Sequence, residues 1–156
     1  IRDNFFKSSD GILKYLNKLR NEKELHQNNK KVLRIFCDFH HTIYSHKRFP
    51  NDRAEIYSLK DKMKLVDFTA NRLSVLHTYK KYSDYTFAIS GSGNGLDSHR
   101  TWELLYLGCI VIMKSSALDK MFENLPVVII KDWRELNNIE NLKKWHNKFK
   151  DFTISN

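Results

Sequence analysis

Apolar residues recur along the chain with two spacings, which predict helices and strands in alternation. Ile12, Leu13, Leu16 and Leu19 have helical spacing, and Ser9 or Asp10 can cap a helix that ends near residue 24. Short β-branched runs predict strands at residues 32–37, 64–68, 86–90, 109–113 and 127–130. Further helices are expected at residues 53–62, 71–82, 98–107, 118–123 and 138–149, and a loop at residues 39–52.

This alternation favours an α/β fold, because strands separated by helices form a parallel sheet that is covered on both faces. We expect a Rossmann-like three-layer sandwich with a mainly parallel sheet of about five strands. The chain has 156 residues and 41% hydrophobic content, enough to bury one core. Residues 1–156 are therefore predicted to form a single domain, with a helix and linker at 1–31 and the α/β core at 32–150.

The net charge of +9 favours an anionic partner, such as nucleic acid, an acidic membrane surface or a phosphorylated small molecule. A lysine-rich solvated surface would explain it equally well. Because basic pairs such as Lys30-Lys31 and Lys143-Lys144 are scattered, nucleic acid is not an expected partner. No membrane span is expected within the chain, since no stretch holds eighteen consecutive apolar residues. The compartment stays open, although the lack of an Asn-x-Ser/Thr sequon weakly disfavours a glycosylated one.

The cysteines and histidines give weak signals. Cys37 and Cys109 lie in strand-like runs, so we expect buried free thiols rather than a disulfide or a nucleophile. The histidine-rich loop at residues 39–46 does not predict a metal site, because adjacent histidines diverge and no second ligand cluster has metal spacing. Ordinary loop histidines are one interpretation, and phosphate contacts are the other, made by His40, His41, Lys47 or Arg53.

The strongest functional signal is a glycine-rich turn between a strand and a helix. The strand at residues 86–90 is followed by Gly91-x-Gly93-x-Gly95 and then by a helix with Arg100 in its first turn. Glycines let a backbone approach a ligand, and the free amides and dipole of a helix start attract an anion. The spacing matches neither the P-loop nor the dinucleotide fingerprint. The alternative is that the glycines only turn the chain and that Arg100 pairs with Asp97.

Ligands of parallel sheets bind at the carboxyl ends of the strands. The turn at residues 90–98 and the loop at residues 39–52 both fall at that edge of the predicted sheet. We therefore expect the two loops to face one crevice.

The glycine turn and its surroundings carry a family resemblance. Gly93-Asn-Gly-Leu-Asp-Ser-His-Arg-Thr-Trp-Glu103, continued by Leu107-Gly-Cys-Ile110 and Leu125-Pro-Val-Val-Ile-Ile-Lys-Asp-Trp133, resembles the nucleotide-sugar-binding half of exostosin-like glycosyltransferases. The similarity is dense there and fainter from Val32 onward. The chain departs from the family at Gly91 and Val111, where proline is common, and at Leu104, where alanine is usual.

The resemblance implies a GT-B arrangement of two Rossmann-like lobes, of which this chain would be the C-terminal, donor-binding one. It implies a nucleoside-diphosphate sugar as substrate, with no obligatory metal and no other cofactor. It also implies a partner lobe N-terminal to this segment, which supplies acceptor contacts and often the catalytic base. The sequence begins with Ile1 rather than Met, which fits our expectation that it is a piece of a longer polypeptide.

The resemblance also implies roles for individual residues. Arg100 and the backbone from Gly93 to Ser98, including Gly95, would hold the diphosphate and stabilise the departing nucleotide. Glu103 would accept hydrogen bonds from ribose hydroxyls, and His99 would donate to a phosphate oxygen or to the sugar. Asn94 and Asp97 would bind sugar hydroxyls.

Two functions stay open at this point. The first is transfer of a sugar to a hydroxyl acceptor such as a glycan, and the second is a non-catalytic nucleotide- or glycan-binding module derived from the same lobe. The role of His99 also stays open, because it could instead be a capping or packing residue. Trp102 is expected in the core rather than as a stacking platform.

Overall fold

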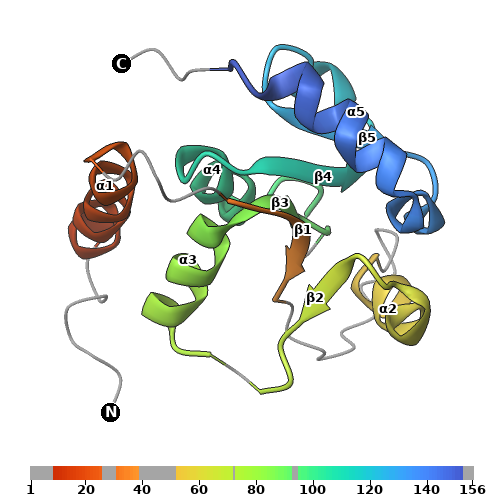
Figure 1. The fold of residues 1–156 in the computed structure, drawn as a ribbon, viewed down its shortest axis with the longest axis horizontal. Helices are drawn as coiled ribbons and strands as arrows, with labels where there is room; N and C mark the ends of the chain where they lie inside the picture. Colours follow the sequence, from red (N-terminus) through yellow and green to blue (C-terminus); the bar gives the residue numbers. More distant parts are fainter. Residues whose placement is uncertain (1–8, 26–30, 39–51, 72, 93–94, 153–156) are drawn as a thin grey trace.

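A computed structural model describes residues 9–25, 31–38, 52–71, 73–92 and 95–152. Five strands form one sheet in the order β2-β1-β3-β4-β5 (Figure 1). Every neighbouring pair is parallel, so the predicted Rossmann-like α/β architecture is confirmed. The strands are β1 (Val32–Cys37), β2 (Val66–Phe68), β3 (Tyr85–Ile89), β4 (Ile110–Lys114) and β5 (Val127–Ile130).

Helices connect these strands, as the alternating pattern predicted. The α-helices are α1 (Ser9–Leu25), α2 (Asp52–Ser58), α3 (Val75–Asp84), α4 (His99–Tyr106) and α5 (Ile139–Phe149). Three 3-10 segments accompany them, η2 (Lys60–Lys62), η3 (Asp119–Phe122) and η4 (Trp133–Asn137). The single helix predicted at residues 53–62 is wrong in extent, because α2 ends at Ser58. The start predicted at Asn71 is also wrong, because Ser74 caps α3 and its side chain accepts a hydrogen bond from the His77 amide.

The sheet is buried on both faces, and successive residues of each strand enter different cores. On β3, Phe87 and Ile89 face one apolar cluster, while Ala88 faces the other. This alternation follows from the two-residue repeat of a strand. The first cluster also takes in residues of α2, η4 and α5, and the second takes in residues of α1, α3 and α4. The three layers are therefore α2 with α5, the sheet, and α3 with α4.

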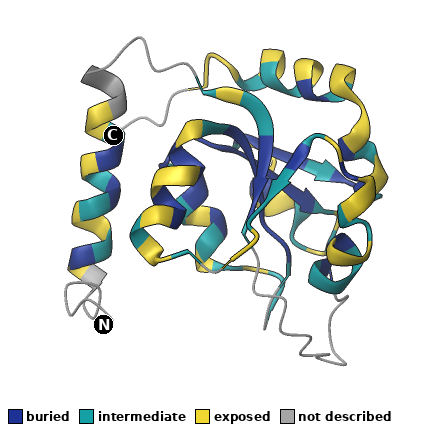
Figure 2. Cartoon of the chain, turned by 60° about the horizontal axis from the view of Figure 1, so that its bottom comes forward, coloured by how far each residue is buried: buried dark blue, intermediate teal, exposed yellow. Residues whose placement is uncertain are grey.

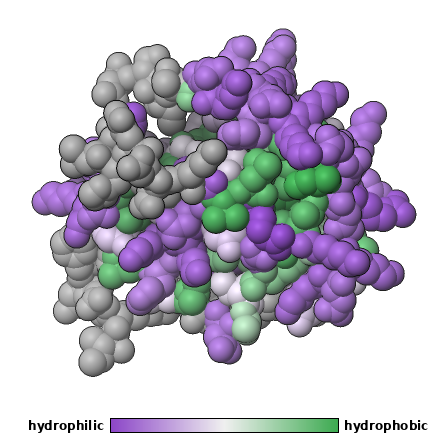
Figure 3. Space-filling model, viewed as in Figure 1, coloured by the Kyte–Doolittle hydropathy of each residue, from purple (hydrophilic) through white to green (hydrophobic). Residues whose placement is uncertain are grey.

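Helix α1 lies outside this sandwich and packs against α3 and α4. Figure 2 shows its buried residues on the side that faces the other helices. Leu16 and Leu19 provide this buried stripe, with 4% and 5% of their surface exposed. On the opposite layer, Figure 3 shows hydrophilic side chains over α5 and a smaller apolar patch between α5 and α2.

The structure agrees with the expectations for the cysteines. Cys37 and Cys109 are buried free thiols, and burial raises the pKa of Cys37 well above its ordinary value.

No described helix is both long and apolar enough to cross a membrane.

The strand order identifies where the connections change direction. From β1 the chain passes to β2 on one side, and it then returns to the other side of β1 to form β3. In open parallel sheets of this order, ligands bind at the carboxyl ends of the two strands that flank the change. The ends of β1 and β3 are therefore the place to look for a site.

Candidate anion-binding site

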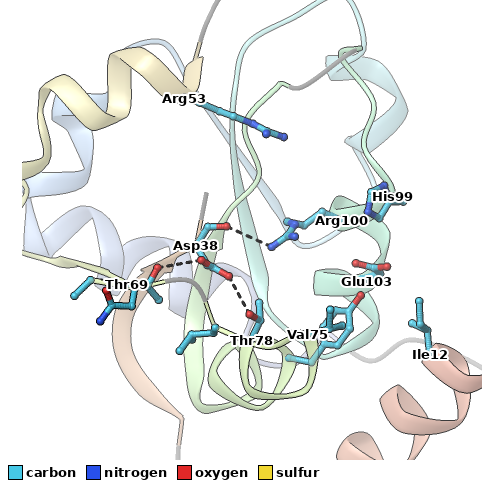
Figure 4. Close-up of a pocket in the computed structure, with 13 residues that line it drawn as sticks. Ile12, Asp38, Arg53, Thr69, Val75, Thr78, His99, Arg100 and Glu103 are labelled. Carbon is cyan, nitrogen blue, oxygen red and sulfur yellow. Dashed lines mark hydrogen bonds between the residues drawn. The ribbon is translucent and has the colours of Figure 1, made fainter. Parts of the chain in front are cut away.

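A cavity of about 420 Å³ opens at this edge of the sheet. Figure 4 shows side chains from several elements pointing into it, among them Asp38 after β1, Thr69 after β2 and Arg100 on α4. Helix α2 contributes Arg53, and α1 contributes an apolar wall at Ile12. The cavity is within the size range of small-molecule sites.

The start of α4 is fixed by its cap and by its buried face. The Ser98 side chain accepts a hydrogen bond from the Arg100 amide, so Ser98 is the N-cap. Thr101 is buried and its hydroxyl lies 2.8 Å from that of Ser90, which ties the helix to the end of β3. Leu104 is fully buried in the core. This packing places His99, Arg100 and Glu103 along the cavity.

The Arg100 side chain lines the cavity and points into it (Figure 4). Its Nη1 donates to the Asp38 carbonyl oxygen and to the Tyr82 hydroxyl, both at 3.4 Å. Both hydrogen bonds are long, and among the ion pairs of the described residues none includes Arg100. Burial lowers the pKa of Arg100, but attraction by Tyr82, Asp38 and Glu103 outweighs burial and raises it overall. Within the part of the chain that the structure describes, the Arg100 guanidinium therefore has no carboxylate in direct contact.

A second guanidinium faces the same space. Arg53 extends from α2 toward the cavity, across from Arg100 (Figure 4). Burial, and then repulsion by Arg100, lower the pKa of Arg53. Two like charges in a partly buried site repel each other, and an anion between them would remove that cost. The pair therefore favours a phosphate-like ligand.

The two acidic residues of the cavity differ in how they are engaged. The carboxylate of Asp38 accepts hydrogen bonds from the hydroxyls of Thr69 and Thr78, each at 3.0 Å. Glu103, the second acidic residue, instead lies near Tyr79. Burial, and then the negative charge of Glu103, raise the pKa of Tyr79. Asp38 thus has a structural role, holding the ends of β1 and β2 against α3, while Glu103 lies on the cavity wall beside Tyr79.

The structure brings together three of the predicted site residues, His99, Arg100 and Glu103. Gly95, Asp97 and Ser98 do not line the cavity, and Gly93 and Asn94 lie outside the described residues. The alternative pairing of Arg100 with Asp97 is wrong, because the Asp97 carboxylate accepts from Trp102 Nε1 at 3.2 Å.

The prediction that Trp102 belongs to the core is also wrong. Trp102 is 43% exposed, because Thr101, Leu104 and Leu105 form the buried side of α4. Its ring lies 5.9 Å from that of Phe122, at the surface rather than in the cavity.

Sequence reasoning missed Asp38, Thr69 and Thr78, which come from three separate elements. One usable signal was present, since Asp38 directly follows the apolar run of β1 at the edge where ligands bind. Of the four residues proposed for phosphate contacts, Arg53 on α2 lines the cavity, while His40, His41 and Lys47 lie outside the described residues. The described residues contain no group of three or more His, Cys, Asp or Glu that could hold a metal ion.

Comparison with known proteins leaves the family open. The sequence matches no protein-family model, and it matches no curated protein.

Proposed function

We propose that this domain is the donor-binding lobe of an exostosin-like glycosyltransferase with a GT-B arrangement. The proposal depends mainly on one observation. Arg53 and Arg100 line the same cavity, at the carboxyl ends of β1 and β3, where the connections between strands reverse direction. Both guanidiniums would bind the diphosphate, for which the planar, always charged arginine side chain is well suited. Glu103 would accept hydrogen bonds from ribose hydroxyls, and His99 would donate to a phosphate oxygen or to the sugar.

The proposed reaction moves a sugar from a nucleoside diphosphate to a hydroxyl group such as that of a glycan. The bond between the sugar C1 and the diphosphate oxygen breaks, and its electron pair leaves with the diphosphate. A new bond forms between C1 and the acceptor oxygen, whose proton passes to a base. Arg100 would stabilise the negative charge that develops on the leaving group, which is the electrostatic form of catalysis.

One observation favours the second candidate, a module that binds a nucleotide or glycan without turnover. The Asp38 carboxylate is occupied by two threonine hydroxyls. A general base must be within reach of the proton that it removes. His99 and Glu103, the other groups of the cavity that could take a proton, are assigned to donor binding in this proposal, so the transferase function would take its base from a partner lobe.

Calorimetric titration with UDP, GDP, UDP-glucose and GDP-mannose in the presence of EDTA tests the donor proposal. We expect saturable binding to at least one nucleotide with a Kd of about 1 mM or tighter, corresponding to at least about 4 kcal/mol. No saturable heat with any of the four would refute donor binding. Turnover by the full-length protein across a panel of acceptors would then separate the transferase from the binding module.

A further inference from the structure

A buried tyrosine hydroxyl lies directly behind the candidate anion-binding site. Tyr82, on α3, has none of its surface exposed and belongs to the apolar cluster on the α3 and α4 side of the sheet. Its ring packs edge-on against that of Phe36, with 4.8 Å between the ring centroids. Phenylalanine would fill the same space, and a hydroxyl buried in an apolar core is costly unless it is hydrogen-bonded. The hydroxyl therefore needs a role other than packing.

The hydrogen bonds of this hydroxyl lead to the site. It accepts from the Asp38 amide at 3.3 Å and from Arg100 Nη1 at 3.4 Å. The central carbon of the Arg100 guanidinium also lies 5.8 Å from the centroid of the Tyr82 ring, within range of a cation–π interaction. Burial raises the pKa of Tyr82, although Arg100 opposes this, so the hydroxyl stays a neutral acceptor. Arg100 thus contacts one tyrosine through both its hydroxyl and its ring.

These contacts use only one corner of the guanidinium. Nη1 donates to Tyr82 and to the Asp38 carbonyl oxygen, whereas within the described ranges Nε and Nη2 of Arg100 donate to no residue. Nε and Nη2 form one edge of the planar group, and their parallel N–H bonds are a fork that can bind two oxygens of one phosphate. Tyr82 does not line the cavity, so a ligand there would contact Arg100 and not the tyrosine behind it.

We propose that Tyr82 is a positioning residue for phosphate binding, which holds Nη1 of Arg100 so that the Nε–Nη2 edge faces the ligand. The inference rests on the proposed function, because only an anion in the candidate anion-binding site makes use of that edge. The ligand group that it names is a phosphoryl group with two oxygens side by side, as in a diphosphate. Holding the side chain before the ligand arrives lowers the entropy cost of binding, since a free arginine has many rotamers to lose.

The Tyr82→Phe variant removes the hydroxyl and keeps the ring, so the core packing and the cation–π contact are retained. The Arg100 guanidinium should then move more freely, while the N-cap Ser98 still fixes the backbone of the helix start. Tyr106→Phe is the matched control. Tyr106 is the last residue of α4, its hydroxyl donates to Asn17, and it does not line the cavity.

NMR relaxation of the ¹⁵N-labelled, ligand-free chain tests the positioning directly. Arg100→Lys, which lacks the Nε–H group, identifies the Nε–H signal of Arg100. We expect the order parameter of this group to fall in Tyr82→Phe from about 0.85, the value of a rigid backbone, to below about 0.6, while the backbone amide of Arg100 keeps its value. Tyr106→Phe should change neither. A flexible Nε–H in the wild type, or the same order parameter in Tyr82→Phe, would overturn the proposal.

Calorimetric titration with inorganic pyrophosphate measures the consequence for binding. We expect Tyr82→Phe to weaken pyrophosphate binding by about three- to tenfold, the size of one hydrogen bond, and Tyr106→Phe to weaken it by less than about twofold. If the Nε–H of Arg100 loosens while the affinity stays that of the wild type, the positioning role is overturned and donor binding stands. If the wild-type chain binds neither pyrophosphate nor any of the four donor nucleotides, the proposed function fails and this inference fails with it.

Discussion

Replacing Arg100 by alanine removes the group on which the proposed diphosphate site most depends. Hydrogen bonds to charged partners contribute about 1.5–3 kcal/mol when they are partly buried. Since 1.4 kcal/mol corresponds to a tenfold change in Kd, the loss should weaken nucleotide binding by about 10- to 150-fold. Arg53 stays in place on the opposite wall, so some affinity for the diphosphate should persist.

The same substitution should change stability little. The two hydrogen bonds that Arg100 makes to Asp38 and Tyr82 are both 3.4 Å long, and its removal relieves the repulsion on Arg53. We therefore expect the change in unfolding free energy to stay below about 1 kcal/mol.

Calorimetric titration, combined with urea unfolding and circular dichroism, measures both effects. Lys143→Ala is the control, because it removes one positive charge from the exposed surface of α5, where Lys143 pairs with Glu140. Arg100→Lys should fall between wild type and alanine, since lysine keeps the charge but loses the planar fork. Equal nucleotide affinity in the wild type and Arg100→Ala would remove Arg100 from the site and refute the reasoning.

Three further outcomes follow from other parts of the structure. Glu103→Gln should weaken binding of UDP or GDP but leave the binding of inorganic pyrophosphate unchanged; equal losses for both would show that Glu103 does not contact the ribose. Gly108→Ala should lower the unfolding free energy by about 1–2 kcal/mol in urea, because Gly108 has φ +70°; a neutral effect would contradict this. The Arg34 guanidinium lowers the pKa of Asp67, so this pair stabilises the fold above the ordinary aspartate pKa of about 3.9 and the gain disappears as the pH falls through the folded value. Arg34→Ala should therefore be less stable than wild type at pH 7 and approach it in acid; a constant difference across that range would argue against the pair.

The fold was predictable because nearly all of its signal is local. The apolar runs of β1, β3, β4 and β5 are short and β-branched, and each is separated from the next by helix-forming sequence. Strand order is different, because it depends on contacts between distant segments. The sequence of β1 contains no local signal that places this strand between β2 and β3.

The same distinction applies to the site. His99, Arg100 and Glu103 were singled out by the family resemblance, and because they share one helix their nearness required only that this helix form. Asp38, Thr69 and Thr78 meet only because the strand order brings the ends of β1 and β2 against α3. The placement of Trp102 failed for a related reason, since its size suggested the core, whereas the helix phase set by Thr101 and Leu104 turns it outward.

A crystal structure of the domain soaked with UDP-glucose or GDP-mannose tests the central claim most directly. The account predicts density for the diphosphate between the guanidiniums of Arg53 and Arg100, at the carboxyl ends of β1 and β3. Density for the nucleotide elsewhere on the domain, with the space between those two side chains left open, would contradict it.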